Sequence, residues 1–585
     1  MNLEIDYLWS HKCPKKWNQY TLVALIITVI LLLILAGVAI SSIMGNGLLG
    51  KAKYTKEKQD EAEELEKTRL SEYESEINRH NNQKQSGNEE NESEQTDKQE
   101  NDSEQSKQNW NEKQKVNTPE LLTGMTPIKF TEPTESAEGE IVTTTADDQS
   151  WYDYNSKKWA NVKTIDGSMW VWIPRFAYKI DKTNQKFDIV FLQGTTDEYQ
   201  KNGETKKAQR QTKLEQTIDT TADYTVHPAF TNESNIGFAN GGWDKELSGI
   251  WVAKFEAGYA GGNNSVTPTT DSNVEYSQKN VWVRKGEDGT NEESSQPARN
   301  LYGDYGEAKT KIKYPTFQGM TYSMNYINQN DAYNLSRDLT SSQNIYGLES
   351  GNADSHLMKN SEWGAVAYLS KSIFGLDTED ININNVSLNN SIRSIYAITG
   401  MCSLTTKSTG LASTKDEINN RTIQYAYNWK QLKGTKASTT GNIYGIYDMS
   451  GGNYERTAGL VANGNMYLTN HGGSMLNNGA KDSTSTKYVT VYKSNDSGES
   501  DINSGSQKNY NANKIYGDGI KETSTSGTGS NSWFKDNSSF PALHGPFIMR
   551  GGNLWTGENS GLFNFTRDGG GSSYYGGFRS VLVKE

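Results

Sequence analysis

The polar side chains near the end of the sequence have the types and spacing of a binding surface. They lie between Arg550-Gly551-Gly552 and Gly577-Phe578-Arg579, in a tract rich in Asn, Ser, Thr, Tyr and Gly. Tyrosine offers a large contact area at low entropic cost, and small polar residues form adaptable hydrogen bonds. We therefore predict a ligand-binding set made of Trp555, Glu558, Asn559, Asn564, Thr566, Arg567, Asp568, Ser572, Ser573, Tyr574 and Tyr575.

The residues that bracket this tract are predicted to be structural: Arg550, Gly551, Gly552, Gly577, Phe578 and Arg579. The two arginines should pair with carboxylates or carbonyls beneath the final loops, and Asp448 and Glu455 are the candidate partners. Phe578 and Leu582 should face the core. Phe563 or Phe565 should hold the loop in place while the polar residues face outward.

Other kinds of chemistry find little support in the sequence. The cysteines are Cys13 and Cys402, and the 6 histidines are scattered, so we predict no disulfide framework, no metal site and no cofactor. The formal net charge of −12 argues against nucleic acid as a partner, because phosphate binding requires a basic face. No catalytic residue is predicted.

The elements that carry this tract begin with a membrane segment. Every residue from Leu22 to Ile40 except Thr28 is apolar or small, which is long enough to cross a bilayer. We predict a cytoplasmic tail at 1–19 and a transmembrane helix at 20–44. Lysines flank both sides of the span, so they do not decide its orientation, and a cleaved secretory signal is the alternative.

Two polar segments follow the apolar run. Residues 45–79 are predicted to be a helical stalk, either a solvated helix or a marginal coiled coil. Residues 80–118 contain almost nothing apolar and are predicted to be a disordered linker, because such a chain buries too little surface to offset its ordering entropy.

The head, at 119–585, is predicted to be of the α+β class. Aromatic residues place a strand at "MWVWIPRFAYKI", with Trp170, Trp172, Phe176 and Tyr178 on one face, and another at "GIWVAKFEAGY". Helical spacing appears in "NDAYNLSRDL", with Asn330 as the cap, and in "NSEWGAVAYLSKS", with Asn360 or Ser361 as the cap. The polar stretches at about 183–223, 260–300 and 480–535 are predicted to be loop insertions.

Three ordered motifs of the head resemble formylglycine-generating enzymes, the sulfatase-modifying-factor family. The motifs are "HLMKNSEWGAVAYL", "NIYGIYDMSGGNYERT" and "MRGGNLW…GGFRSVLV". The resemblance implies a C-type-lectin-like fold. The enzymes of that family use cysteines in the carboxy-terminal segment to bind copper, and this chain has none between Arg550 and Glu585. Gly452 also stands where the family has a calcium-ligating Asn, which leaves Glu455 alone.

Two further resemblances concern the ends of the chain. The pattern "RGG-x-W…G-LF…GFR" resembles the variable region of proteins diversified by diversity-generating retroelements, and an ordinary polar loop is the alternative. The helix at "YTLVALIITVILLLILAGVAI" resembles that of prepilins, but Gln19 and Ala24 replace the family's glycine and glutamate.

The sequence thus predicts a single-pass cell-membrane protein with an extracellular, non-catalytic, ligand-binding head. The expected partners are the membrane and an unknown surface protein or glycan. The alternatives are an enzyme of the sulfatase-modifying-factor type with an atypical site, and a pilin-like structural subunit.

Overall fold

The computed structural model describes the head of the chain. The described residues are 116–258, 315–387, 397–403, 427–493 and 515–585, except 214, 215, 322, 326, 343, 526 and 574, together with short strands at 274–276, 282–284, 412–415, 422–423 and 426. The predicted tail, transmembrane helix and stalk, and the linker up to residue 115, lie outside them. Within the described residues, no helix has the length and apolar character to cross a membrane.

The described residues include a short segment before the predicted head boundary at residue 119. The side-chain amide of Asn117 donates hydrogen bonds to the carbonyls of Gly194, at 2.8 Å, and Ser248, at 2.9 Å. Residues 116–118, which were predicted to be linker, therefore belong to the head.

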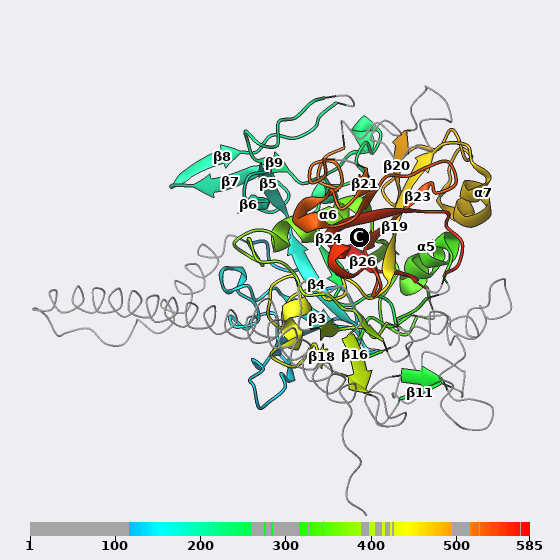
Figure 1. Ribbon diagram of the computed structural model, residues 1–585. Coiled ribbons are helices and arrows are strands. Elements are labelled where there is room, and N and C mark those ends of the chain that lie inside the picture. The colour runs from blue at the N-terminus through cyan, green and yellow to red at the C-terminus, as the bar shows by residue number, and fades with distance from the viewer. Residues whose placement is uncertain are drawn as a thin grey trace, which may run out of the picture. The chain divides into compact units, whose positions relative to one another are not determined.

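The head is a mixed α+β structure made mostly of sheet, as the sequence predicts (Figure 1). In its first large sheet, the last strand of the chain, β26, lies between β13 and β10, which come much earlier in the sequence. In spatial order its strands are β13 (Ala353–Leu357), β26 (Ser580–Lys584), β10 (Gly249–Ala253), β4 (Met169–Pro174), β3 (Asn161–Lys163), β1 (Thr126–Phe130) and β2 (Ile141–Thr143).

An aromatic pair lies near the centre of this sheet. Trp172 on β4 lies directly opposite Trp251 on β10, with ring centroids 5.1 Å apart, and Trp251 in turn lies opposite Leu582. All three side chains are buried. Cross-strand aromatic pairs of this kind stabilise a sheet beyond the area they bury.

The predicted strand at "MWVWIPRFAYKI" is in fact two strands. β4 ends at Pro174, and β5 (Phe176–Asp181) belongs to a different sheet, with β6 (Lys186–Phe191) and β9 (Thr225–Val226). The prediction of an insertion at 183–223 is wrong for β6, because Phe187, Ile189 and Phe191 are buried.

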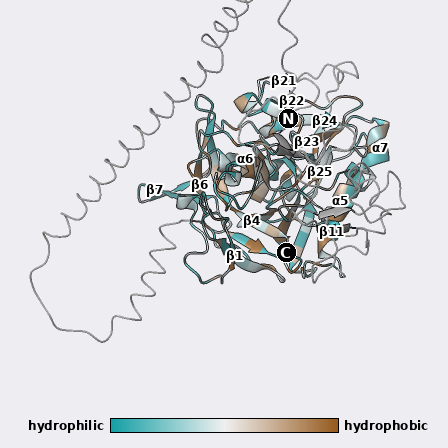
Figure 2. Ribbon diagram, turned by 60° about the horizontal axis from the view of Figure 1, so that its bottom comes forward, coloured by the Kyte–Doolittle hydropathy of each residue, from teal (hydrophilic) through white to brown (hydrophobic). Residues whose placement is uncertain are grey.

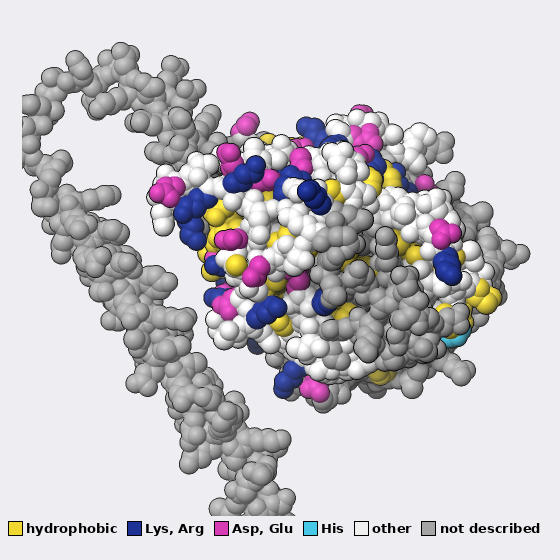
Figure 3. All heavy atoms as spheres, turned by 90° about the horizontal axis from the view of Figure 1, so that it is seen from above, with side chains coloured by type: hydrophobic (Ala, Val, Ile, Leu, Met, Phe, Trp, Pro, Cys, Tyr) yellow, Lys and Arg dark blue, Asp and Glu magenta, His cyan; other side chains and the backbone are white. Residues whose placement is uncertain are grey.

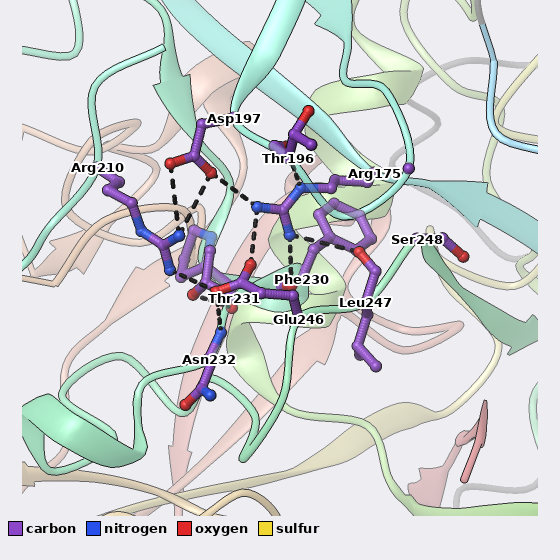
Figure 4. Close-up of polar contacts among 12 residues, drawn as sticks. Arg175, Thr196, Asp197, Arg210, Phe230, Thr231, Asn232, Glu246, Leu247 and Ser248 are labelled. Atoms are coloured by element: carbon purple, nitrogen blue, oxygen red, sulfur yellow. Dashed lines mark hydrogen bonds and ion pairs between the residues drawn. The ribbon is translucent and has the colours of Figure 1, made fainter. Parts of the chain in front are cut away.

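The break between β4 and β5 is held by Arg175, whose guanidinium is fully buried. It donates to the carbonyls of Thr196 and Phe230 and pairs with Asp197, at 2.9 Å, and Glu246, at 2.8 Å. Figure 4 shows Arg210 approaching the same two carboxylates from the other side. Two cations and two anions therefore balance one another in this cluster.

The second large sheet carries the polar tract. Its strands, in spatial order, are β20 (Thr490–Lys493), β19 (Tyr454–Ala462), β23 (Phe547–Gly551), β24 (Gly561–Asp568), β22 (Ser538–Ser539) and β21 (Thr528–Gly529), and β25 (Gly576–Phe578) also pairs with β19. The predicted insertion at 480–535 is wrong at β20, which pairs in parallel with β19.

Three α-helices accompany the sheets in the described part of the chain: α5 (Gln329–Arg337), α6 (Asn360–Ser370) and α7 (Met466–Gly472). All of α6 is buried, and at Gly364 an added Cβ would lie 1.9 Å from the Gly517 carbonyl oxygen, so only glycine fits. The cap of α5 is Asn328, which accepts from the Asp331 amide, and not the predicted Asn330. Neither predicted cap of α6 is correct, because the helix follows Lys359.

The remaining elements are short. The strand β7 (Glu198–Lys201) lies at the edge of the head and is hydrophilic, whereas hydrophobic segments lie inside (Figure 2). The other strands are β7 (Glu198–Lys201), β8 (Glu204–Lys207), β11 (Val274–Tyr276), β12 (Trp282–Arg284), β14 (Val386–Ser387), β15 (Met401–Ser403), β16 (Ala412–Lys415), β17 (Thr422–Ile423) and β18 (Ala426–Asn428). Short 3-10 helices lie at Tyr154–Ser156, Pro228–Phe230, Ser234–Ile236, Asp338–Thr340, Gly434–Ala437, Gly473–Met475, Trp533–Lys535 and Gly557–Asn559.

Candidate ligand-binding site

Arg579 anchors the last strands to the core. Its guanidinium binds Glu455 through two hydrogen bonds, at 2.9 and 2.5 Å, and donates to the carbonyls of Ala253 and Tyr447. Arg579 and Glu455 are both buried. The predicted pairing of a bracketing arginine with Glu455 is confirmed, and the two-point contact has the geometry of a strong charge-assisted pair.

Arg550 is also fully buried. It donates to the carbonyl oxygens of Asn564, Asp518 and Gly519 at 2.8–3.0 Å. The prediction that the arginines hold carbonyls beneath the final loops is therefore confirmed here as well.

Asp448 is not a direct partner of either arginine. Its carboxylate accepts from the Asn384 side chain and from the Gly400 amide, both at 2.8 Å. Burial raises the pKa of Asp448 to about 6. Burial, together with Asp448 and Glu455, raises the pKa of the nearby Glu256 well above its ordinary value.

The Glu455 carboxylate is occupied by the Arg579 guanidinium. In the described part of the chain, no group of three or more His, Cys, Asp and Glu residues has the arrangement of a metal site.

The loop after β23 turns at two glycines in the left-handed region. Gly551 and Gly552 have φ angles of 84° and 77°, and an added Cβ at Gly552 would lie 2.5 Å from the Ser560 hydroxyl oxygen. The backbone can therefore reach the 3-10 helix at Gly557–Asn559 only with glycine at this point. The loop then holds itself together, since the Asn553 side chain accepts from the Trp555 amide at 2.9 Å.

A pocket of about 360 Å³ opens where this loop meets the strands of the second sheet. From the strands come Tyr454, Met549, Thr566, Arg567 and Asp568, and from the adjoining loops come Asn553, Trp555 and Tyr575. Tyr454 and Tyr575 meet edge to face, with centroids 6.0 Å apart, and the Tyr454 amide donates to the Tyr575 carbonyl at 2.8 Å. The strand pairing Met549–Thr566 places the buried Met549 behind this opening.

The pocket gathers five of the predicted binding residues: Trp555, Thr566, Arg567, Asp568 and Tyr575. Trp555 is 39% exposed and is the most exposed aromatic side chain of the described residues. Glu558 is exposed and Asn559 half-buried, but neither lines the pocket. Ser572 and Ser573 are half-buried and lie just before the pocket residue Tyr575 in the sequence. Tyr574 lies outside the described residues.

Asn564 does not face outward as predicted. It is fully buried, and its side-chain amide donates to the Asn559 carbonyl at 2.7 Å. The physical reason is that β24 is covered on both faces, so that Leu562, Phe563 and Phe565 are buried along with it. Asn564 therefore belongs to the framework, and both phenylalanines hold the strand in place.

Asp568 has a structural role in addition to its place in the pocket wall. The buried Arg456 binds it at 2.5 Å, and the same guanidinium donates to the Gly571 and Ile327 carbonyls. Arg456 thus fixes the start of the loop at 569–573. The sequence interpretation missed Arg456, together with the lining residues Tyr454, Met549 and Asn553.

One signal for these residues was available in the sequence. Tyr454 and Arg456 flank Glu455 in the motif "GGNYERT", and neighbouring side chains of a strand point to opposite faces. With Glu455 directed at Arg579, Tyr454 and Arg456 share the other side of β19, which faces the tract.

Comparison with protein-family models finds no match, and a search of curated proteins finds no matching sequence.

Proposed function

We propose that this chain is a membrane-anchored surface protein whose head binds a ligand in the pocket between Trp555 and Tyr575. One observation carries the proposal: the polar tract that has the composition of a binding loop also supplies most of the lining of this pocket. The framework arginines beneath it hold the pocket on buried strands, which suits a preorganised site.

Within this proposal the head has a C-type-lectin-like fold. Support comes from the place of β26 between β10 and β13, which joins the end of the chain to early strands. The helix α6 also lies within the motif "HLMKNSEWGAVAYL", which carries part of the resemblance.

A binding screen with matched variants tests the proposal. The purified full chain is applied to an array of surface glycans and surface proteins, beside the double variant Trp555→Ala/Tyr575→Ala and the control Ile165→Ala, whose side chain is 63% exposed and does not line the pocket. We expect retention that the double variant loses and the control keeps. Equal retention of all three proteins would show that the pocket is not the binding site.

The membrane anchor is tested separately, since the segment at 20–44 lies outside the described residues. We expect the full chain to stay with membranes through an alkaline wash, and release by the wash would contradict a spanning helix. Recovery of a mature chain beginning at Tyr20 would favour the alternative of a pilin-like subunit.

The alternative of an oxidising enzyme is weakened by the surroundings of Cys402. The thiol is buried, and burial raises its pKa to about 12, so it stays protonated and a poor nucleophile or metal ligand. We expect no conversion of a cysteine peptide to formylglycine by the full chain, with or without copper, as measured by mass spectrometry.

Nucleic acid is not a partner in this proposal. On the face shown in Figure 3, the charged side chains of both signs are intermingled and form no basic stripe.

Diversification by a retroelement remains part of the proposal. If it occurs, related copies should vary at the outward-facing Trp555, Glu558 and Arg567, and keep the buried Asn564 and the Arg456-bound Asp568. A nearby reverse transcriptase gene and a near-copy of the 3′ end are the genomic signs to look for.

A further inference from the structure

The glycine-rich loop at 569–573 lies directly on the helix α7, which is beside α5 at one edge of the head (Figure 1). Gly570 has a φ angle of 83°, and an added Cβ there would lie 2.5 Å from the Phe547 ring and 2.8 Å from the Cβ of His471. An added Cβ at Gly571 would lie 3.7 Å from the His471 ring. The backbone of the loop is therefore packed against the His471 side chain with no side chain between them.

Two hydrogen bonds of the Gly570 backbone hold the loop in this position. Its amide donates to the Asp568 carboxylate at 2.6 Å, and its carbonyl accepts from the Gln329 amide, at the start of α5, at 2.8 Å. Asp568 precedes the loop, Tyr575 follows it, and both line the pocket. A displacement of the loop would therefore change the pocket wall.

His471 is half-buried between an aromatic ring and a charged pair. On α7 itself the Tyr467 ring stacks on it, with centroids 5.9 Å apart and an angle of 17° between the planes. From β19 comes Arg456, which donates to the Gly571 carbonyl and binds Asp568 of β24. Burial and the Arg456 guanidinium hold the pKa of His471 below its ordinary value, although Asp568 acts to raise it. The closed loop therefore favours a neutral imidazole.

Within the described residues, the other elements around α7 bring no further charge that acts on His471. The nearest parts of α5 and β23 are the uncharged Gln329 and Phe547. The loop before β23 carries a second histidine, the exposed His544, whose ring meets Tyr467 edge to face with centroids 5.9 Å apart. His544 touches the same tyrosine, and it serves as a matched control.

We propose that protonation of His471 opens the loop at 569–573 and thereby alters the pocket in acid. The imidazolium would lie half-buried near Arg456, where like charge and poor hydration both disfavour it. Displacement of the loop from α7 exposes the imidazolium to water. The closed loop binds the proton less readily than the open loop, so the closed form is stable above the ordinary pKa of histidine and is lost as the pH falls. The inference goes beyond the proposed function and does not depend on the identity of a ligand.

Hydrogen–deuterium exchange of the purified full chain tests the inference, read at the Gly570 and Gln329 amides and corrected for the intrinsic effect of pH on exchange. We expect the protection of both amides to fall several-fold between about pH 7.5 and about pH 5.5, and at most about tenfold, because the exposed histidine has an ordinary pKa of about 6.5. His471→Gln should remove this response, and His544→Gln should keep it.

A second variant guards against misfolding. His471→Phe keeps a flat, uncharged ring against Tyr467 and should also lack the response, and thermal melts at neutral pH show that each variant is folded. Protection that does not change with pH in the wild-type chain overturns the inference, as does a response that persists in both His471 variants or disappears in His544→Gln. An equal loss of protection at the Val252 amide, in the central strand β10, would mean that the whole head opens, and it overturns the inference too.

Discussion

Two arginine clusters in the head differ in how their cations and carboxylates are balanced. At the break between β4 and β5, Arg175 and Arg210 face Asp197 and Glu246, so two cations balance two anions. Beneath the pocket, Arg579 pairs with Glu455, while Asp448 and Glu256 are buried nearby with amide partners only. A balanced cluster is stable when all its groups are ionised, whereas the second cluster has more carboxylates than cations.

The two clusters should therefore respond to pH with opposite signs. Burial acts to raise the pKa of Glu246, but Arg175 and Arg210 outweigh it and hold that pKa below its ordinary value. The stability that Glu246 contributes is present above its unfolded pKa and is lost as the pH falls. Burial raises the pKa of Asp448 from 3.8 to about 6, so its contribution is full at low pH and is lost as the pH rises.

The largest effect is expected from Arg579→Met. This change leaves Glu455 buried beside Asp448 and Glu256 without a cation, which should cost about 3–5 kcal/mol in the free energy of unfolding. Denaturant unfolding at neutral pH measures it, and the loss should shrink near pH 5, where the carboxylates take up protons. Arg175→Met should cost less, because Arg210 remains beside its two carboxylates. An equal loss in both variants at every pH would remove the distinction between the clusters.

Asp448→Asn should change the pH dependence of stability more than its level. An increase of the pKa from 3.8 to about 6 corresponds to about 3 kcal/mol that the wild-type chain loses between pH 4 and pH 7. The variant cannot ionise, so its stability should fall by about 3 kcal/mol less over that range. Asp147→Asn, at an exposed position, is the control. Parallel curves for Asp448→Asn and the wild type would contradict a protonated Asp448.

Glu246→Gln should lower the free energy of unfolding by a smaller amount, with a pH dependence opposite to that of Asp448→Asn. It removes two charge-assisted contacts and should cost about 2 kcal/mol at neutral pH. The cost should disappear as the pH falls below about 4, because the wild-type carboxyl is then protonated as well. Thermal unfolding at pH 3 and pH 7 measures the difference, and a cost that persists at pH 3 would indicate lost packing instead of lost charge.

The smallest effect on stability is expected at the pocket itself. Trp555→Ala removes a side chain that is 39% exposed and should change the free energy of unfolding by no more than about 0.5 kcal/mol. Thermal melts beside the binding screen make the comparison. Destabilisation as large as that of Arg579→Met would place Trp555 in the framework and not in the binding face.

The sequence was sufficient for the parts of the site that depend on residue type. The α+β class, the buried Phe578 and Leu582 and the pairing of Arg579 with Glu455 were predicted and are confirmed. The sequence also predicts five of the pocket residues, because aromatic and polar residues in a glycine-rich tract are typical of binding loops. These features depend on local chemistry, which the sequence displays.

The predictions that are wrong concern burial and strand pairing, which depend on residues far away in the sequence. Asn564 is predicted to face outward as a polar residue of a loop, but it lies on β24, which is covered on both faces, and it is buried. Tyr454 reaches the pocket only because β19 pairs with β23, almost 100 residues further along the chain. The composition of 183–223 predicts a loop because its buried apolar side chains, among them those of β6, are diluted by many polar residues.

The place of β26 also has a consequence for how the protein is made. Of the seven strands in the first sheet, β26 is the last along the chain, yet it lies inside the sheet between β13 and β10. During synthesis, therefore, β10 emerges from the ribosome with one edge unpaired, and β13 emerges without any partner in this sheet. More than 200 further residues are made before β26, their shared neighbour, is available. A chain interrupted before residue 580 should therefore leave these strand edges exposed and prone to pairing with other chains.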